Sequence, residues 1–282
     1  MIEINPLEFS FKKIVRDALY EDLGHQGDIT SNSVIKSNLQ HSFVLKSRSD
    51  GVISGIQVAE LSFKLLDSSL NFKKNLNDGS IVKKDDIIAT INGSASSILS
   101  AERTSLNFLS HLSGIASATN EMVNLISGTN TKIVSTRKTT PNLRILEKFA
   151  VKDGGGINHR FGLYDGILIK DNHLALSGSI NNSVSLAREK CGHMVNIEVE
   201  VDNLDQYREA LETQTDAILL DNFKIEDLVK AVNLNNKNII LEASGKITKD
   251  NILEIAKTGV DLISSGWLTH SSPSLDIGLD FA

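Results

Sequence analysis

Short runs of β-branched and aliphatic residues alternate with amphipathic segments through the second half of the chain. The segments between the runs, such as LDQYREALETQ and KIEDLVKAVNL, have the apolar spacing of helices that bury one face. Strands that alternate with helices of this size are typical of βαβ units and of a parallel sheet. The pattern therefore predicts six strands, at residues 132–138, 166–173, 195–203, 217–223, 238–246 and 260–266.

The spacing of these strands is nearly constant. Glu200, Asp221, Glu242 and Ser264 follow one another at intervals of 21, 21 and 22 residues. Such a period favours a closed or nearly closed α/β barrel over an irregular open sheet. Because only six strands are evident, we expect an incomplete α/β barrel of six or seven strands.

The first hundred residues have a different pattern. A helix is predicted at 7–20, two strands around the Asp50-Gly51 turn, and a long helix from Leu99 to Ile126. This pattern predicts an α/β fold in which an N-terminal α+β sandwich domain precedes the barrel. We place the sandwich at residues 1–112 and the barrel at 113–269, with the tail 270–282 as a candidate to return to the sandwich.

Composition narrows the functional classes. The 282 residues include 29 basic and 35 acidic side chains, a net charge of −6, which argues against a general nucleic-acid or membrane surface. The single cysteine, Cys191, has no partner for an internal disulfide, so we expect a cytoplasmic protein. Neither a signal peptide nor an apolar stretch of the ~20 residues needed to span a bilayer is evident.

Positive charge is nevertheless concentrated in one segment. Residues 137–173 contain seven lysines and arginines against four acids, with His159 and His173 in addition. Solvated helix faces account for Arg144, Lys148 and Lys152, but not for the others. The three glycines of GGGINHR, at 154–160, read as a helix end followed by a tight turn, directly before a histidine and an arginine.

Each predicted strand ends in polar residues, and the active sites of α/β barrels lie at the carboxyl ends of the strands. Arginine and lysine at these ends suit a ligand with several negative charges. Carboxylates suit sugar hydroxyls or a divalent metal, and Ser-Gly turns suit a phosphate, although strand-end polar residues also cap helices. Together they indicate a phosphorylated sugar. The cations are Arg137, Lys138, His159, Arg160 and Lys170; the carboxylates are Glu200 and Asp221; the turns hold Ser244, Gly245, Lys246, Ser265 and Gly266.

Two alternatives remain open at this point, and a third is disfavoured. Arg103 falls in phase with the apolar stripe of the long helix, so it needs a partner. It either pairs with an acid such as Glu102 or reaches an anionic site, in its own subunit or across a subunit boundary. Lys170 could instead form a Schiff base, as in barrel aldolases. His159 and His173 lie 14 residues apart without local histidine or cysteine partners, which disfavours zinc.

The motif series resembles that of the quinolinate phosphoribosyltransferases, also called nicotinate-nucleotide pyrophosphorylases (carboxylating). The matching stretches occur in order over nearly the whole chain: EDLGHQGDITS, AERTSLNFLSHLSGIAS, STRKTTP, LEKFAVKDGGGINHRFGLYDGILIKDNH, IEVEVDN, ILLDNF, LEASGKI and GWLTHS. The related molybdenum-utilisation homologues resemble it less, because their equivalent of LIKDNH generally departs from this pattern. The chain also departs from the family, since Lys246 and Trp267 replace a usual glycine and a usual small residue.

The resemblance implies a pentosyltransferase of de novo NAD biosynthesis. Such an enzyme converts quinolinate and phosphoribosyl pyrophosphate to nicotinate mononucleotide, CO₂ and pyrophosphate with Mg²⁺, and works as a homodimer. By motif, Lys138, Glu200 and Asp221 are catalytic, with the two carboxylates at the ribose and Mg²⁺. Quinolinate is bound by Thr136, Arg137, Lys138, His159, Arg160, Lys170 and, from the neighbouring subunit, Arg103; the ribose and phosphate are bound by Glu200, Asp221, Ser244, Gly245, Lys246, Ser265, Gly266 and Trp267.

Overall fold

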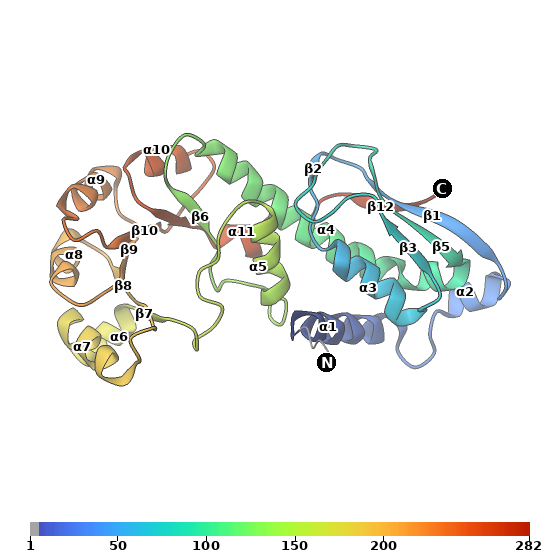
Figure 1. The fold of residues 1–282 in the computed structure, drawn as a ribbon, viewed down its shortest axis with the longest axis horizontal. Coiled ribbons are helices and arrows are strands. Elements are labelled where there is room, and N and C mark those ends of the chain that lie inside the picture. The colour runs from blue at the N-terminus through green and yellow to red at the C-terminus, as the bar shows by residue number, and fades with distance from the viewer. Residues whose placement is uncertain (1–5) are drawn as a thin grey trace. The chain divides into compact units, whose positions relative to one another are not determined.

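The computed structural model describes residues 6–282, which form two units (Figure 1). The first unit holds the described residues up to Asn120 together with 140–155 and 271–282. The second unit holds 121–139 and 156–270. None of the described helices is long and apolar enough to cross a membrane.

A four-stranded antiparallel sheet organises the first unit. Its order is β12-β1-β5-β3, with β1 at Gln40–Ser47, β3 at Asn71–Lys74, β5 at Ile87–Ser94 and β12 at Ile277–Phe281. The apolar sheet residues share one core with α3 (Ile56–Leu66) and with α4 (Ala95–Leu125). Phe63, Ile91 and Leu109 are fully buried in this core, so helices and sheet pack together as the predicted sandwich.

The two strands expected around Asp50-Gly51 are present, but they do not pair with each other. β2 (Gly51–Val52) pairs with β4 (Ile81–Val82), while β1 pairs with β5 and β12. Asp50 accepts hydrogen bonds from the Lys83 ammonium and the Lys84 N–H, both at 2.9 Å. These contacts hold the Asp50 segment against the turn between β4 and β5.

The boundary between the units differs from the one expected at residue 112. Helix α5 (Arg144–Asp153) belongs to the first unit, because Leu146 and Ala150 share a second core with Leu112 and Ile115 of α4. Helix α1 (Pro6–Leu23) also packs in this core, and the short α2 (Ile29–Val34) follows it. The C-terminal tail lies in the first unit, where β12 pairs with β1.

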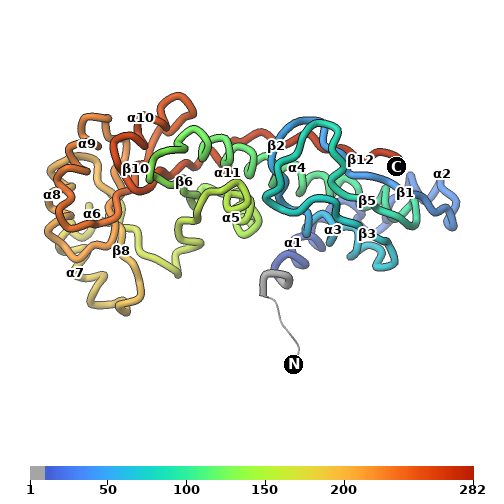
Figure 2. Tube along the Cα trace, turned by 45° about the horizontal axis from the view of Figure 1, so that its top comes forward, coloured from blue at the N-terminus to red at the C-terminus, as the bar shows by residue number. Residues whose placement is uncertain are grey.

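A six-stranded parallel sheet forms the second unit. All six predicted strands are found, in the order β6-β11-β10-β9-β8-β7, and β6 and β7 remain as its two edges. The sheet is therefore an incomplete barrel, and its helices lie along the outer side (Figures 1 and 2). The strands are β6 (Lys132–Val134), β7 (Ile167–Ile169), β8 (Ile197–Val201), β9 (Ala217–Asp221), β10 (Ile240–Ser244) and β11 (Leu262–Ser264); the helices are α6 (Asp171–Ser177), α7 (Ile180–Lys190), α8 (Leu204–Leu211), α9 (Ile225–Leu234), α10 (Ile252–Lys257) and α11 (Trp267–His270).

Candidate active site at the carboxyl edge of the barrel sheet

The strand register gathers the predicted polar residues at one edge of the sheet. Ile169 pairs with Val199, Asp221 with Ser244, and Ser264 with Val134, so neighbouring strands end at nearly the same level. The polar residues follow directly after these ends. The residues of the second unit that sequence reasoning selected therefore share this edge, although they come from seven separate segments.

Arg137 and Arg160 are close enough to repel each other, and each has an unused donor. The Arg160 Nη1 donates to the Gly166 carbonyl at 2.8 Å, while the Nε atoms of Arg137 and Arg160 are buried without a partner among the described residues. Burial lowers the pKa of Arg160, and the charge of Arg137 lowers it further. Two neighbouring guanidinium groups with buried free donors are what an anion with carboxylate or phosphate geometry would satisfy.

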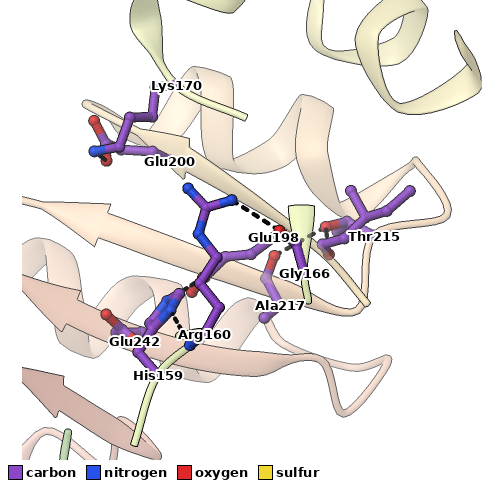
Figure 3. Close-up of polar contacts among 10 residues, drawn as sticks. His159, Arg160, Gly166, Lys170, Glu198, Glu200, Thr215, Ala217 and Glu242 are labelled. Carbon is purple, nitrogen blue, oxygen red and sulfur yellow. Dashed lines mark hydrogen bonds and ion pairs between the residues drawn. The ribbon is translucent and has the colours of Figure 1, made fainter. Parts of the chain in front are cut away.

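His159 lies against two buried acids. Its Nε2 is 2.7 Å from Glu198 Oε2 and 3.9 Å from Glu242 Oε2, and its Nδ1 is 2.8 Å from the backbone nitrogen of Arg160 (Figure 3). Candidate ligand atoms of these three residues lie within 4.8 Å of one another, so the group is also a possible metal site by distance. The cluster sits on β8, β10 and the segment that follows GGG.

Glu242 is the most enclosed member of this cluster. Its side chain is 2% exposed, and its Oε1 has no hydrogen-bond partner in the described part of the chain. Burial raises the pKa of Glu242 to about 7, and the neighbouring charge of Glu198 acts in the same direction. Glu242 is therefore largely protonated up to neutral pH, which avoids two adjacent buried anions.

Lys170 and Glu200 form an ion pair between neighbouring strand ends. The Lys170 Nζ donates to Glu200 Oε2 at 2.6 Å, and both side chains are partly exposed (Figure 3). This pairing leaves Glu200 Oε1 for another ligand. It also gives Lys170 a carboxylate partner in place of the apolar surroundings that a Schiff-base lysine requires.

Asp221 is oriented by the residue that follows it. Asn222 adopts a positive φ of 55° and donates from Nδ2 to Asp221 Oδ2 at 2.6 Å, while its backbone N–H donates to Ser244 O. Its amide fills the space in which a Cβ on Gly245 would stand. Asn222 thus connects the β9 carboxylate to the Ser-Gly turn after β10, and only glycine fits at position 245.

The remaining residues that the sequence selected lie near the turn after β11. Lys138 packs over Gly266, where an added Cβ would lie 2.7 Å from Lys138 Cδ, and Thr269 Oγ1 donates to the Lys138 carbonyl at 2.7 Å. Thr136 Oγ1 accepts from the Lys138 N–H at 3.0 Å. Lys246 is exposed with φ of 50°, a conformation that explains why glycine is usual at this position. Trp267 begins α11 and lies 5.8 Å from the Lys249 Nζ.

Arg103 is separate from these residues. It lies on α4 in the first unit and is exposed, not buried in the apolar stripe as its phase suggested. It lines a cavity of about 430 Å³ within the first unit, together with Asn107 and His111. In this structure the acid Glu102 is half-buried beside Arg103, whose charge lowers the Glu102 pKa while burial, the larger effect, raises it.

Sequence reasoning missed Glu198, Asn222 and the structural role of Glu242. Glu198 lies two positions before Glu200, so the alternation of a strand places both on the same face. A charged residue inside a β-branched run is the available signal, since such a position is buried and the charge needs a partner. The role of Asn222 depends on its backbone conformation, which the residue type alone does not reveal.

The fold and the site define an α/β-barrel protein with a cationic edge of arginines and lysines beside two carboxylates. Comparison with known families gives two matches: "Quinolinate phosphoribosyl transferase, N-terminal domain" over residues 28–113 and "Quinolinate phosphoribosyl transferase, C-terminal domain" over residues 115–280. The chain belongs to the quinolinate phosphoribosyltransferase family.

Individual relatives agree with this assignment. The chain is 44% identical to a probable nicotinate-nucleotide pyrophosphorylase [carboxylating] of Bacillus subtilis, over 95% of this chain and 92% of that protein. It is 43% identical to a probable nicotinate-nucleotide pyrophosphorylase [carboxylating] of Methanocaldococcus jannaschii, over 95% and 96% of the two chains. The crystal structure of nicotinate-nucleotide pyrophosphorylase from Ehrlichia chaffeensis superposes with a TM-score of 0.93, at 41% identity and with full coverage of both chains.

Proposed function

We propose that this protein transfers the phosphoribosyl group of phosphoribosyl pyrophosphate to quinolinate, with loss of CO₂, giving nicotinate mononucleotide and pyrophosphate. Membership of the family supports the reaction. Within the site, the observation that carries it is a pair of half-buried arginines, Arg137 and Arg160, whose buried Nε atoms have no partner among the described residues. Quinolinate is a dicarboxylate, and it supplies the paired acceptors that these donors lack.

On this proposal the cationic side of the edge orients the pyridine ring. Arg137 and Arg160 bind its carboxylates, and Thr136, Lys138 and Lys170 complete the polar wall around them. The ring nitrogen attacks C1 of the ribose as pyrophosphate leaves, so positive charge develops at the sugar. Once the nitrogen is quaternary, it stabilises the electron pair left when the adjacent carboxylate departs as CO₂, and no further cofactor is needed for that step.

The carboxylate side suits the phosphoribosyl group. Glu200 and Asp221 each engage one carboxylate oxygen with a neighbour, at Lys170 and Asn222, so the other oxygen is proposed to serve the ligand. Their negative charge favours a developing positive charge on the ribose. The backbone of the turns after β10 and β11 is proposed to hold the 5′-phosphate, at Ser244, Gly245, Lys246, Ser265, Gly266 and Trp267.

Mg²⁺ is the proposed cofactor. It binds oxygen ligands and is commonly held by one or two carboxylates together with substrate phosphates, and Glu200 and Asp221 provide that donor set. When bound, the ion would neutralise charge on the departing pyrophosphate. The protein's own contribution is to orient the two carboxylates, through the Lys170 ion pair and the Asn222 amide.

We further propose a cytoplasmic homodimer in which Arg103 serves the site of the neighbouring subunit. The exposure of Arg103 at the edge of a cavity fits a residue whose ligand comes from outside its own unit. Mixing Arg103→Ala and Arg160→Ala subunits tests this arrangement. Recovered activity in the mixed dimer supports a shared site, and inactivity despite demonstrated subunit exchange contradicts it.

The reaction itself is tested with purified protein, quinolinate, phosphoribosyl pyrophosphate and Mg²⁺. We expect release of CO₂ together with nicotinate mononucleotide, and neither product when quinolinate is omitted. An Arg137→Ala variant with an unchanged melting temperature serves as the site-specific control. Folded wild-type protein that forms neither product overturns the proposal.

A further inference from the structure

His159 connects a buried carboxylate to the backbone of a residue in the site. Its Nε2 lies 2.7 Å from Glu198 Oε2 and its Nδ1 lies 2.8 Å from the Arg160 nitrogen, so both ring nitrogens are in hydrogen bonds inside the protein (Figure 3). Glu198 is 8% exposed, and its own strand, β8, is anchored between β7 and β9. The His159 ring is thus hydrogen-bonded to a residue on an inner strand of the sheet.

The direction of one of these bonds fixes the protonation of the ring. A backbone N–H can only donate, so His159 Nδ1 is an acceptor and carries no proton. The single ring proton is then on Nε2, where it is donated to Glu198. These two hydrogen bonds together point to a neutral His159 ring, whereas the sequence pattern placed His159 among the cations.

The hydrogen-bond directions around His159 also disfavour a metal ion in the cluster. A metal on His159 Nε2 would place the ring proton on Nδ1, against the Arg160 N–H that already points there. The group His159, Glu198 and Glu242 meets the distance requirement for a metal, but the hydrogen-bond directions do not fit one. The cluster is instead a hydrogen-bonded support.

Several further hydrogen bonds hold the segment that carries Arg160, among them one from the Ser135 N–H to the Ile157 carbonyl at 3.0 Å. Ile157 donates to the Ile133 carbonyl at 2.8 Å, and Ser135 Oγ donates to Asn158 Oδ1 at 3.0 Å, which attach the segment to β6. Beyond these contacts, His159 is the connection to β8. His159 thus supports the backbone of Arg160, and the hydrogen bond to the Gly166 carbonyl holds its guanidinium.

We propose that Glu198 is a positioning residue, which holds His159 as the neutral Nε2–H tautomer and through its Nδ1 fixes Arg160 in the orientation that binds a substrate carboxylate. This inference rests on the proposed function for the identity of the ligand, but not for the tautomer. It assigns to His159 a connecting role in place of a direct charge–charge contact with the substrate.

The tautomer is tested by ¹⁵N NMR of the histidine ring in the full-length protein. We expect one protonated and one unprotonated nitrogen for His159, with the signals assigned by their loss in a His159→Gln variant. Two protonated nitrogens at pH 7, or a proton on Nδ1, overturn the proposal whether or not the protein turns over quinolinate.

The positioning role is tested by two substitutions that separate charge from hydrogen bonding. Glu198→Gln keeps an acceptor oxygen for the His159 proton, so we expect the KM for quinolinate within about twofold of wild type. Glu198→Leu removes the acceptor, and the KM for quinolinate should rise roughly tenfold, as for one lost hydrogen bond, while the KM for phosphoribosyl pyrophosphate is unchanged. The exposed Glu212→Gln is the control and should match wild type.

Two kinetic outcomes overturn the positioning role. One is an equal effect of Glu198→Gln and Glu198→Leu on quinolinate, which would assign the effect to charge. The other is a common loss of affinity for both substrates, which would indicate general damage to the fold. If Glu198→Leu does not fold, Glu198→Gln still decides, because a rise in its quinolinate KM beyond the stated range contradicts the proposal.

Discussion

Gly245→Ala is expected to damage the phosphate side of the site through Asn222. Gly245 has φ of 91°, and an alanine Cβ would lie 2.5 Å from Asn222 Cγ, well inside the ~3.5–4 Å of an ordinary carbon contact. Asn222 must therefore move by about 1 Å and release the 2.6 Å bond to Asp221. The Asp221 carboxylate then loses its orientation.

The magnitude follows from two separate contributions. A left-handed backbone costs an alanine roughly 1–2 kcal/mol, and the lost hydrogen bond to a carboxylate costs roughly 1.5–3 kcal/mol. Gly178→Ala provides a matched control, because Gly178 has φ of 94° with no atom within 4 Å of the added Cβ. We expect Gly178→Ala to lower the unfolding free energy by about 1–2 kcal/mol and Gly245→Ala by about 3–5 kcal/mol.

Denaturant unfolding and steady-state kinetics measure these differences. The KM for phosphoribosyl pyrophosphate should rise roughly tenfold or more in Gly245→Ala and stay unchanged in Gly178→Ala. A Gly245→Ala/Asn222→Gly double variant should recover the stability lost to the clash but not the KM, because Asp221 still lacks its donor. Equal destabilisation by the two single variants, with equal KM values, would refute the reasoning.

Three further predictions concern charge in the site. Arg160→Lys should raise the KM for quinolinate roughly tenfold or more, because a lysine cannot bond the Gly166 carbonyl and a substrate carboxylate at the same time. The exposed Arg208→Lys is the control and should have no effect. Equal KM values for the two variants would contradict the anion-binding role of Arg160. Because folding raises the pKa of Glu242 from 4.5 to about 7, the folded state binds this proton more tightly, and the free energy of unfolding should fall as pH rises from 4.5 to about 7. Glu242→Gln should flatten this decline, as measured by urea unfolding at several pH values. An unchanged slope in the variant would contradict the raised pKa of Glu242. Removal of divalent cations with EDTA should abolish nicotinate mononucleotide formation and added Mg²⁺ should restore it, so turnover that persists in EDTA would exclude the proposed cofactor role.

The pattern of apolar residues was sufficient to predict the barrel. The spacing of apolar residues along a strand or a helix indicates which of its faces is buried. Each βαβ unit is stabilised by burying that face. The two strands predicted around Asp50-Gly51 are present, but the strands they pair with depend on distant parts of the chain. Lys83 and Lys84 hold Asp50, and these contacts are not visible in the local sequence.

The residue types at the strand ends indicated a polyanion site, because cations and carboxylates must be solvated, paired or bound to a ligand wherever they lie. The sequence by itself thus determined the fold class and predicted an anionic ligand. Only the tertiary structure decided the protonation of His159, since that depends on an Arg160 N–H and a Glu198 carboxylate meeting on opposite sides of one ring. The orientation of Asp221 likewise required the backbone angle of Asn222, because hydrogen bonds have directions that a list of residue types does not contain.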